Sequence, residues 1–572
     1  MKILGLNYGG HDTSAALTVD GELIAACEQE RYDYDKHSRN FPIDAINSCL
    51  NKGKLKINEI DVLSLGHDPI LENKERYFNL IFSINQRIEF IKSDFVRIKR
   101  NLFYEKYLRE KLNYKNKIEF NNHHLCHLYS AYIPSGFKKS LVISYDGLAE
   151  IHTALFALGE NNKLKILHDK NKFPNSLGLA YSAITDYLGW KHHCDEGIIM
   201  GLAPYGNYNE KIKNTNTSYI SFFRKLITLD KNDQLRFNLN FKYFGFNIKK
   251  NNWVTDEFYK IFGKKRKPNS QINNKHKNLA AALQKRIEEI VILQIKYLKK
   301  KYKYDYLCIA GGLGLNCSLN GKIEKLKIFK KIFIQPASGD SGLSYGSCLV
   351  SNINNKIKLK NNKINFYKGH SDTYLQILKN IKKTKMSFKI MNNFSLVANL
   401  LSQGKIIAWF QGEAEFGPRA LGNRSILSRP YPLNMKDHIN KNVKFREYFR
   451  PFAPAILEEY LFDYFDINQK SEHMLIACKV KNNRKKNIPA TVHVDNTCRV
   501  QSVSKKSNLK FWQLLSEFNK ITNIPVLLNT SFNIKGQPIV NNSDDAIRCF
   551  KKYAIDYLVI DNVIISKSDD FK

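Results

Sequence analysis

No stretch of the sequence reaches the roughly 18 consecutive apolar residues that a membrane-spanning helix needs. The first residues, MKILGLNYGGHDTSAAL, also lack the long apolar core of a secretory signal peptide. Ten cysteines are present and none forms a Cys-X-X-Cys pair, a usage typical of free thiols in the cytosol. The sequence therefore predicts a cytoplasmic protein with no membrane span, zinc ribbon or disulfide framework.

Acidic residues are scarce, with 53 Asp and Glu against 90 Lys and Arg, and the net charge is +37. The basic excess is mostly Lys dispersed among Asn and Ile, as in NNKIKLKNNK at 354–363. We interpret it as solvated surface and expect no nucleic acid partner, with a polyanion-binding face as the alternative. The excess would still attract anionic substrates.

A Gly-X4-Gly-Lys-Ser/Thr loop is absent, which excludes a P-loop nucleotidase. Three glycine turns are present instead, and we expect each to follow a strand: Gly9–Asp12, Gly201–Gly206 and Gly311–Asn316. Glycine lets backbone N–H groups approach a phosphate closely. The candidate nucleotide-binding residues are Gly201, Gly311, Gly312 and Asn316, while ordinary turns remain the alternative for each segment.

Short apolar strands are predicted at 2–7, 14–19 and 22–27, and again at 140–146, 152–157 and 164–168. Helices follow each set, including a long one at 278–302. This pattern predicts an α/β fold in which a strand-turn-strand unit occurs twice, as in actin-like ATPases. A polar break at 351–368 separates two predicted domains, 1–365 and 385–572. Residues 70–118 read as a helical insertion in the first domain.

His123 and His127 stand at i and i+4, so a helix would place both rings on one face. Asp146 ends an apolar strand, and Asp340 lies in the small-residue turn ASGDSG after a strand at 331–335. Two imidazoles and two carboxylates suit Fe(II), Mn(II) or Zn(II). The spacing alone leaves a metal site and a plain helix pair equally open, and His124 is expected to pack or support the others.

Arginine and lysine gather in the C-terminal part within segments rich in Gly, Pro and aromatic residues. The guanidinium fork and the ammonium match phosphate and carboxylate, and a serine adds a hydroxyl. The arrangement predicts a site for a small acyl phosphate, with surface cations as the alternative. The candidates are Arg419, Lys444, Arg450, Arg499, Asn529 and Ser531.

At this point the sequence resembles the NodU/CmcH carbamoyltransferase family, which includes tobramycin carbamoyltransferase. The resemblance covers nearly the whole chain, in the segments NYGGHDTSAAL, ERYDYDKH, HHLCHLYSAY, SYDG, MGLAPYG, GGLGLN, PASGDSG, GEAEFGPRALGNRSI, REYFRPFAP and LNTSFN. It implies an actin-like (ASKHA) N-terminal domain and a YrdC-like C-terminal domain. Ile198 departs from the family pattern, where Lys is common, which puts one phosphate contact of the ATP site in doubt.

The resemblance also implies an O-carbamoyltransferase that makes carbamoyl-adenylate from carbamoyl phosphate and ATP with Mg²⁺. Arg419, Lys444, Arg499 and Ser531 would take carbamoyl phosphate, with Lys36, Arg450 and Asn529 as further substrate contacts. An iron ion would be held by His123, His127, Asp146 and Asp340, with His11 and Asp12 beside the reacting centre. The acceptor would be a hydroxyl of a sugar, a glycan precursor or a secondary metabolite, and the family allows a homodimer.

Two other functions are compatible with the same fold. A tRNA-modifying enzyme of the threonylcarbamoyl type would share the adenylate chemistry, and the net charge favours it. A non-catalytic actin-like nucleotide-binding protein would need neither the four metal ligands nor the anion cluster. Binding of tRNA at physiological salt would identify the first, and pyrophosphate release that depends on carbamoyl phosphate would exclude the second.

Overall fold

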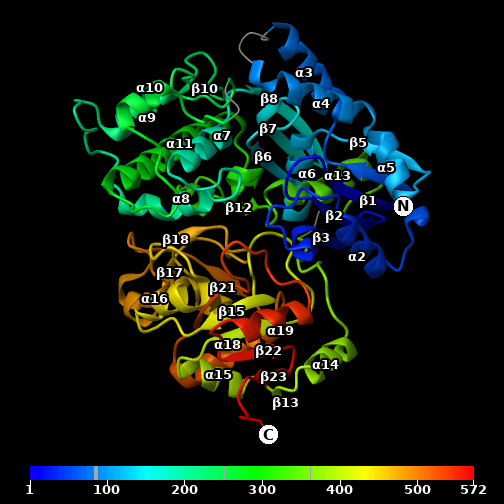
Figure 1. The fold of residues 1–572 in the computed structure, drawn as a ribbon, viewed down its shortest axis with the longest axis vertical. Helices are drawn as coiled ribbons and strands as arrows, with labels where there is room; N and C mark the ends of the chain where they lie inside the picture. The colour runs from blue at the N-terminus through cyan, green and yellow to red at the C-terminus, as the bar shows by residue number, and fades with distance from the viewer. Residues whose placement is uncertain (83–87, 249–250, 361–362, 572) are drawn as a thin grey trace.

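The computed structural model describes residues 1–82, 88–248, 251–360 and 363–571. Two five-stranded sheets occupy the N-terminal part, which is blue to green in Figure 1, and an eight-stranded sheet occupies the C-terminal part below it. We call these the N-terminal unit and the C-terminal unit. In the described residues, no helix is long and apolar enough to cross a membrane.

The two sheets of the N-terminal unit have the same strand order and directions. The first runs β3-β2-β1-β4-β5, with β1 antiparallel to β2 and parallel to β4. The second runs β8-β7-β6-β11-β12, with β6 antiparallel to β7 and parallel to β11. The bounds are β1 Lys2–Asn7, β2 Ser14–Val19, β3 Glu22–Glu28, β4 Val62–Leu65, β5 Lys117–Phe120, β6 Lys139–Tyr145, β7 His152–Glu160, β8 Lys163–Lys172, β11 Tyr306–Ala310 and β12 Lys331–Ile334. The repeat confirms the predicted duplicated, actin-like α/β fold.

Two helices fill the space between these sheets. Helix α6 (His123–Ser135) and α13 (Leu343–Asn354) pack on each other, α6 against β6 and β11 and α13 against β1 and β4. The contact is close because glycines permit it: a Cβ at Gly346 would lie 2.3 Å from the carbonyl oxygen of Cys126. The outer face of the second sheet is covered by α7 (Leu177–Tyr187), α8 (Glu196–Leu202) and α11 (Asn274–Tyr302), whose apolar side chains share one core with it.

The segment predicted as an insertion at 70–118 is the connection between the parallel strands β4 and β5. Parallel neighbours need a crossover, which here is built from α3 (Pro69–Phe82), α4 (Ile91–Leu102) and α5 (Tyr104–Leu112). The segment expected to be an insertion thus forms this crossover, between two four-residue strands that the sequence analysis did not identify. Residues 83–87 of the segment lie outside the described residues.

The C-terminal unit is a mixed sheet with helices on both faces, as predicted for a second α/β domain. Its order is β13-β23-β22-β14-β15-β21-β16-β20. Helices α15 (Ser395–Ser402) and α18 (Leu509–Thr522) cover one face, while α14 (Tyr374–Lys382) and α19 (Ser543–Lys552) lie on the other. The strands are β13 Ser387–Ile390, β14 Ile407–Phe410, β15 Arg424–Ser428, β16 Ala453–Leu457, β20 Gln501–Val503, β21 Val526–Ser531, β22 Tyr557–Ile560 and β23 Val563–Ser566.

A buried ion pair fastens the two units together. Arg31 lies in α1 (Glu30–Asp33), and its Nε is 2.7 Å from Glu28 Oε2. The backbone of Gly417 in the C-terminal unit donates from N to Glu28 Oε1 (2.6 Å), and its carbonyl oxygen accepts from Arg31 Nη2 (2.9 Å). Both polar groups of one C-terminal residue are thus held by the N-terminal unit, two positions before Arg419.

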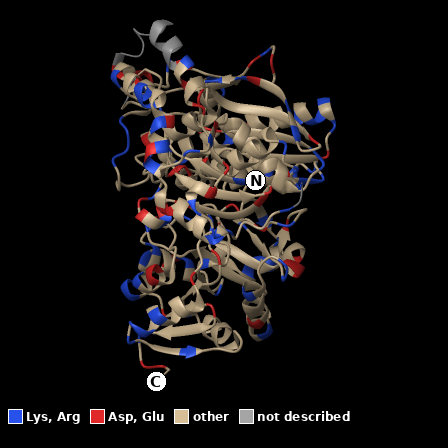
Figure 2. Ribbon diagram, turned by 90° about the vertical axis from the view of Figure 1, so that its right-hand side faces the viewer, with Lys and Arg blue, Asp and Glu red and all other residues tan. Residues whose placement is uncertain are grey.

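Basic side chains are spread over the surface rather than gathered into a single stripe. Figure 2 shows Lys and Arg on every level of the molecule, interleaved with Asp and Glu. A nucleic acid groove would instead need a continuous basic face. The interpretation of the charge as solvated surface stays a prediction.

Candidate active site

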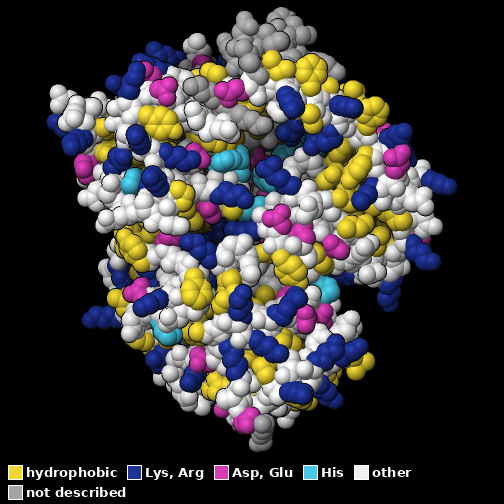
Figure 3. All heavy atoms as spheres, in the orientation of Figure 1, with side chains coloured by type: hydrophobic (Ala, Val, Ile, Leu, Met, Phe, Trp, Pro, Cys, Tyr) yellow, Lys and Arg dark blue, Asp and Glu magenta, His cyan; other side chains and the backbone are white. Residues whose placement is uncertain are grey.

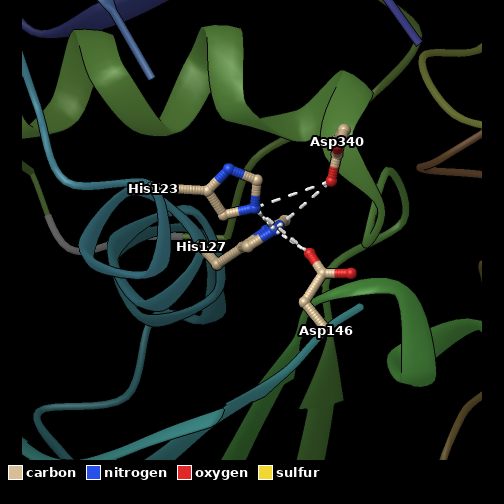
Figure 4. A group of neighbouring side chains, drawn as sticks. All are labelled: His123, His127, Asp146 and Asp340. Carbon is tan, nitrogen blue, oxygen red and sulfur yellow. Dashed lines mark hydrogen bonds and ion pairs between the residues drawn. The ribbon is translucent and has the colours of Figure 1, made fainter. Parts of the chain in front are cut away.

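Four side chains from three separate elements meet between the two halves of the N-terminal unit (Figure 4). His123 and His127 project from the first turns of α6, with their Nε2 atoms 3.1 Å apart. Asp146 directly follows β6, and its Oδ2 lies 3.2 Å from His123 Nε2 and 2.8 Å from His127 Nε2. Asp340 enters from the turn before α13, with Oδ1 at 3.6 Å from His123 Nε2 and 3.8 Å from His127 Nε2. In Figure 3, histidines are visible in a hollow of this unit.

The donor set fits a single divalent cation. Ligands at about 2.0–2.2 Å from one ion, at tetrahedral or octahedral angles, lie about 2.8–3.6 Å apart, close to the separations found here. The Nε2 atoms of His123 and His127 lie 3.1 Å apart and share Asp146 and Asp340 as neighbours. Two imidazole nitrogens and two carboxylates that converge in this way form a donor set for one ion. The mixed nitrogen and oxygen set suits Fe(II), Mn(II) or Zn(II) better than Ca²⁺ or Mg²⁺.

Neighbouring residues hold the helix that carries the two histidines. Asn122 caps α6 by accepting from the backbone N of Leu125, and Glu150 Oε1 accepts from the backbone N of His123 at 3.2 Å. His124 points away from the cluster, with Nδ1 2.9 Å from Ser144 Oγ and Nε2 3.0 Å from the carbonyl oxygen of His152. His124 therefore packs against the second sheet, as the sequence predicted, and is not a ligand.

His11 and Asp12 lie at the edge of the same cluster, in the turn between β1 and β2. His11 donates from Nδ1 to Asp12 Oδ2 (2.8 Å), and its Nε2 lies 3.8 Å from Asp340 Oδ2. Burial disfavours the charged ring, but the carboxylates of Asp340 and Asp12 outweigh it and raise the pKa of His11 to about 9. The second oxygen of Asp12 accepts from His37 Nδ1 at 2.6 Å, so one carboxylate joins two imidazoles.

Two of the three predicted glycine turns follow strands and reach the cluster. Gly311, after β11, has φ +82° and lies so close to Tyr145 that a Cβ would be 2.1 Å from its carbonyl oxygen. The backbone N of Gly312 is 3.4 Å from Asp146 Oδ1. Asn316 caps α12 (Cys317–Lys325), and its amide is bonded to Gln284, so its polar atoms are occupied within the protein.

The third glycine segment is not a turn after a strand, and that prediction was wrong. Gly201 lies inside helix α8, which ends at Leu202 and continues as a 3-10 turn to Tyr205. The closest contact of a Cβ at Gly201 would be Pro451 of the C-terminal unit at 3.6 Å. Small residues here serve close packing between elements, because a Cβ at Gly206 would lie 2.1 Å from the carbonyl oxygen of Lys277. Ile198, on the same helix, is buried.

The C-terminal unit carries a second cluster, around Lys444 and Ser531. Lys444 is buried and donates from Nζ to the carbonyl oxygens of Ser531 (2.9 Å) and Asn533 (2.6 Å) and to Asn533 Oδ1 (2.7 Å). Ser531 Oγ lies 3.3 Å from the same nitrogen. Ser531 is the last residue of β21, so the segment LNTSFN begins within the strand and continues beyond its end.

Arginines surround this lysine with little negative charge to balance them. Burial, together with Arg446 and Arg450, holds the pKa of Lys444 well below its usual value. Burial and the neighbouring Arg499 lower the pKa of Arg419 to about 9. The Nε atoms of Arg419 and Arg499 are buried and have no hydrogen-bond partner within the described part of the chain. Unpartnered buried donors on mutually repelling cations are what a bound anion would satisfy.

Two predicted substrate contacts remain: Lys36 lies beside this cluster, and Asn529 lies within the sheet. Lys36, from the N-terminal unit, is near enough to Lys444 to lower its pKa by charge repulsion. The adjacent His37 contacts Asp12, so two consecutive residues face the two clusters. Asn529 is buried in β21 and donates to Gln501 Oε1 (2.9 Å) and to the carbonyl oxygen of Ala420 (3.2 Å), which holds the loop next to Arg419.

Sequence reasoning missed several residues at the two clusters. His37 was quoted in ERYDYDKH without a role, because a loop side chain has no periodicity to show where it points. Cys317, at the start of α12 in the N-terminal unit, contacts Arg499, and no spacing signal links these two residues. Arg446 was counted among the cations but not proposed, and it bonds Asn440 Oδ1 (2.7 Å) while stacking on Phe452.

Comparison with protein families gives one match for each unit. The Carbamoyltransferase N-terminus model matches residues 2–349, and the Carbamoyltransferase C-terminus model matches residues 398–567. The chain is 32% identical to nodulation protein NolNO of Sinorhizobium fredii, over 97% of this chain and 79% of that protein. It is 34% identical to an uncharacterised protein of Synechocystis sp., over 99% of this chain and 97% of that protein.

Two solved structures show a distant likeness to the chain. Component A of (R)-2-hydroxyglutaryl-CoA dehydratase from Acidaminococcus fermentans aligns with a TM-score of 0.31 and 11% identity, over 61% of this chain and 97% of that one. Full-length HypF in the phosphate- and nucleotide-bound form also gives 0.31, with 12% identity over 62% of this chain and 55% of that one. Family membership rests on the two family models and the relatives aligned over nearly the whole chain: this protein belongs to the carbamoyltransferase family and is a transferase.

Proposed function

We propose that the enzyme forms carbamoyl-adenylate from carbamoyl phosphate and ATP and transfers the carbamoyl group to a hydroxyl. Water first cleaves carbamoyl phosphate to carbamate and phosphate. A carbamate oxygen then attacks the α-phosphorus of ATP, and pyrophosphate leaves. The acceptor hydroxyl finally attacks the carbamoyl carbon, AMP leaves, and the hydroxyl proton passes to a base.

The arginine and lysine cluster suits the first step. Carbamoyl phosphate is a small dianion, and Arg419 and Arg499 each have a buried Nε without a partner among the described residues. Each charge-assisted hydrogen bond to a phosphate oxygen would be worth about 1.5–3 kcal/mol. Lys444 and Arg450 add positive charge, and the hydroxyl of Ser531 completes the set.

The four-ligand cluster suits the last step. A divalent cation held by His123, His127, Asp146 and Asp340 would act as a Lewis acid towards the carbamoyl oxygen and offset the two carboxylate charges. His11 is fixed by its Nδ1 hydrogen bond to Asp12, so its Nε2 faces the cluster. A cation bound there would offset the carboxylates that raise the pKa of His11, and the neutral ring would then take the hydroxyl proton at Nε2. Asp12 is in turn held by His37.

Nucleotide would bind along the turn at Gly311 and Gly312, next to Asp146. Because these residues have no side chain, their backbone N–H groups can approach a phosphate closely. Mg²⁺ would accompany ATP. The acceptor would be a hydroxyl of a sugar, a glycan precursor or a secondary metabolite. The single observation that carries the proposal is the presence, in one chain of this family, of a four-ligand cluster suited to a cation and of two arginines whose buried Nε atoms have no partner among the described residues.

The route is tested with purified enzyme by measuring pyrophosphate, AMP and carbamoylated product. With carbamoyl phosphate, ATP and Mg²⁺, we expect release of pyrophosphate and AMP that depends on carbamoyl phosphate, and carbamoylated product when a panel of nucleotide-sugars is added. Asp146→Asn should retain cleavage of carbamoyl phosphate and lose transfer, while Asp256→Asn, an exposed control, should retain both. Transfer without ATP, or release of ADP instead of AMP, would contradict the adenylate route.

A further inference from the structure

Helix α4 buries two polar residues beside Ile98 and exposes large apolar side chains, which an ordinary surface helix would bury. Its buried residues are Asp94, Ile98 and Asn101. Asn101 donates to Glu72 Oε2 (2.8 Å) and to Asn73 Oδ1 (3.0 Å), so the inner face is fixed by a polar network. An apolar outer face is therefore not a consequence of core packing.

The outer face is apolar and basic. Phe95, Val96, Leu102 and Phe103 are 55–64% exposed. At 100° per residue these four, with the exposed Lys92 and Lys99, fall on one side of the helix. We call these six residues the α4 face. Figure 3 shows hydrophobic and basic side chains next to each other in this upper right part of the molecule.

We propose that the α4 face binds an anionic bilayer surface. Four large apolar side chains on a convex helix, flanked by lysines, are the chemistry of helices that lie in the membrane interface. The long lysine stems can run beside the apolar groups while their charges contact lipid phosphates. The only acidic residue of α4, Asp94, is buried on the opposite side, so no negative charge of this helix opposes the lipid.

The position of this face relative to the active site gives the binding a consequence. Arg100 of α4 donates from Nη1 to the carbonyl oxygen of Gly9 (3.0 Å), and Tyr104 of α5 donates to that of Tyr8 (2.7 Å). The turn that carries His11 is thus fastened to the same helices. An acceptor hydroxyl on a lipid-anchored molecule would be presented beside this turn. That consequence rests on the proposed function, whereas bilayer binding does not.

Cosedimentation of the full-length protein with vesicles tests the proposal. We expect binding to vesicles of equal parts phosphatidylglycerol and phosphatidylcholine, weakened by high salt, and little binding to pure phosphatidylcholine. Phe95→Asp with Phe103→Asp, and separately Lys92→Glu with Lys99→Glu, should each weaken binding by more than about tenfold. Leu375→Asp, at a residue 79% exposed on α14, is the matched control and should bind as the parent does.

Three results of the vesicle experiment would each overturn the proposal. These are equal binding to neutral vesicles, binding by both double variants at the parent's strength, and no vesicle binding by the parent. Self-association that is lost in Phe95→Asp with Phe103→Asp, without vesicle binding, would also overturn it and assign the α4 face to a second copy. Because vesicle binding needs no turnover, its failure leaves the proposed carbamoyl transfer untouched, and failed transfer leaves bilayer binding untouched.

Discussion

The two clusters of this enzyme are built in opposite ways. The four-ligand cluster pairs two imidazoles with two carboxylates, each delivered by the end of a regular element. The arginine and lysine cluster gathers charges of one sign, from loops, a strand end and the end of a short π-helix, and buries them. The first is shaped for a cation and the second for an anion. Each carries repulsion or unsatisfied donors that its ligand would relieve, so each should respond to the loss of a different ligand.

The largest effect is expected at the four-ligand cluster. His127→Ala should lower bound metal to a small fraction of the parent's and reduce carbamoyl transfer by more than about 100-fold, the upper range for a residue that only supports a ligand. Elemental analysis and a transfer assay measure the two quantities. His438→Ala, at an exposed histidine of the C-terminal unit, should match the parent. Equal metal content in His127→Ala and the parent would show that the cluster holds no ion.

The second effect separates the anion cluster from the cation cluster. Arg419→Ala and Lys444→Met should each weaken use of carbamoyl phosphate by about 10- to 150-fold, corresponding to the loss of about 1.5–3 kcal/mol. Metal content should not change. Lys441→Met replaces an exposed lysine three positions before Lys444 and is the control. Unchanged pyrophosphate release in both variants would refute the assignment.

A smaller effect should come from the ion pair that joins the units. Arg31→Leu removes the donor to the carbonyl oxygen of Gly417 and leaves Glu28 buried, so it should raise the KM for carbamoyl phosphate several-fold by loosening the Arg419 loop. Arg39→Leu, at an exposed arginine, should be neutral. A rise in KM in a variant whose melting temperature equals that of the parent would support the positioning role. An unchanged KM in such a variant would show that the loop holds its place without Arg31.

The smallest expected effect is the uptake of protons when an anion binds at Lys444. Burial and neighbouring cations depress the pKa of free Lys444, and a bound anion stabilises its charged form, so binding should take up protons. The affinity for inorganic phosphate should accordingly fall as pH rises through the depressed pKa. Calorimetry in buffers of different ionisation enthalpy measures the uptake, which Lys444→Met should reduce. Proton release on binding would reverse the assigned sign and reject the account.

The residues of the four-ligand cluster could be predicted from the sequence because they lie on a helix and at strand ends. The arginine and lysine cluster could be predicted only in part. The i, i+4 spacing of His123 and His127 fixes their shared face, and strands that end at Asp146 and before Asp340 bring both carboxylates to the same sheet edge. Cations near Arg419 and Lys444 stood out by composition, but no periodicity reports which loop side chains are buried or unpartnered. His37 and Cys317 approach their partners only through tertiary packing.

One prediction failed for a local reason, and one segment was described only incompletely. The segment from Gly201 to Gly206 was interpreted as a phosphate-binding turn, but Gly201 lies inside helix α8, and Gly206 permits a close approach to the backbone of Lys277. Strands β4 and β5 are four residues each and flank long helical patterns, so the sequence did not show that the segment at 70–118 connects two neighbouring strands. The predicted domain bounds and the likeness of the C-terminal unit to the YrdC fold stay predictions.

The contact at Gly417 has a mechanical consequence. Gly417 has φ +119° and lies against Pro336, so a Cβ there would come within 2.8 Å of the Pro336 carbonyl oxygen. Pro336 is four residues before Asp340, and Gly417 is two residues before Arg419. If one unit rotated relative to the other and this contact were kept, the pivot would lie between the two clusters. Asp340 and Arg419 are near that pivot, so they would move little. The outer ends of the units could then swing widely while Asp340 and Arg419 kept nearly the same separation.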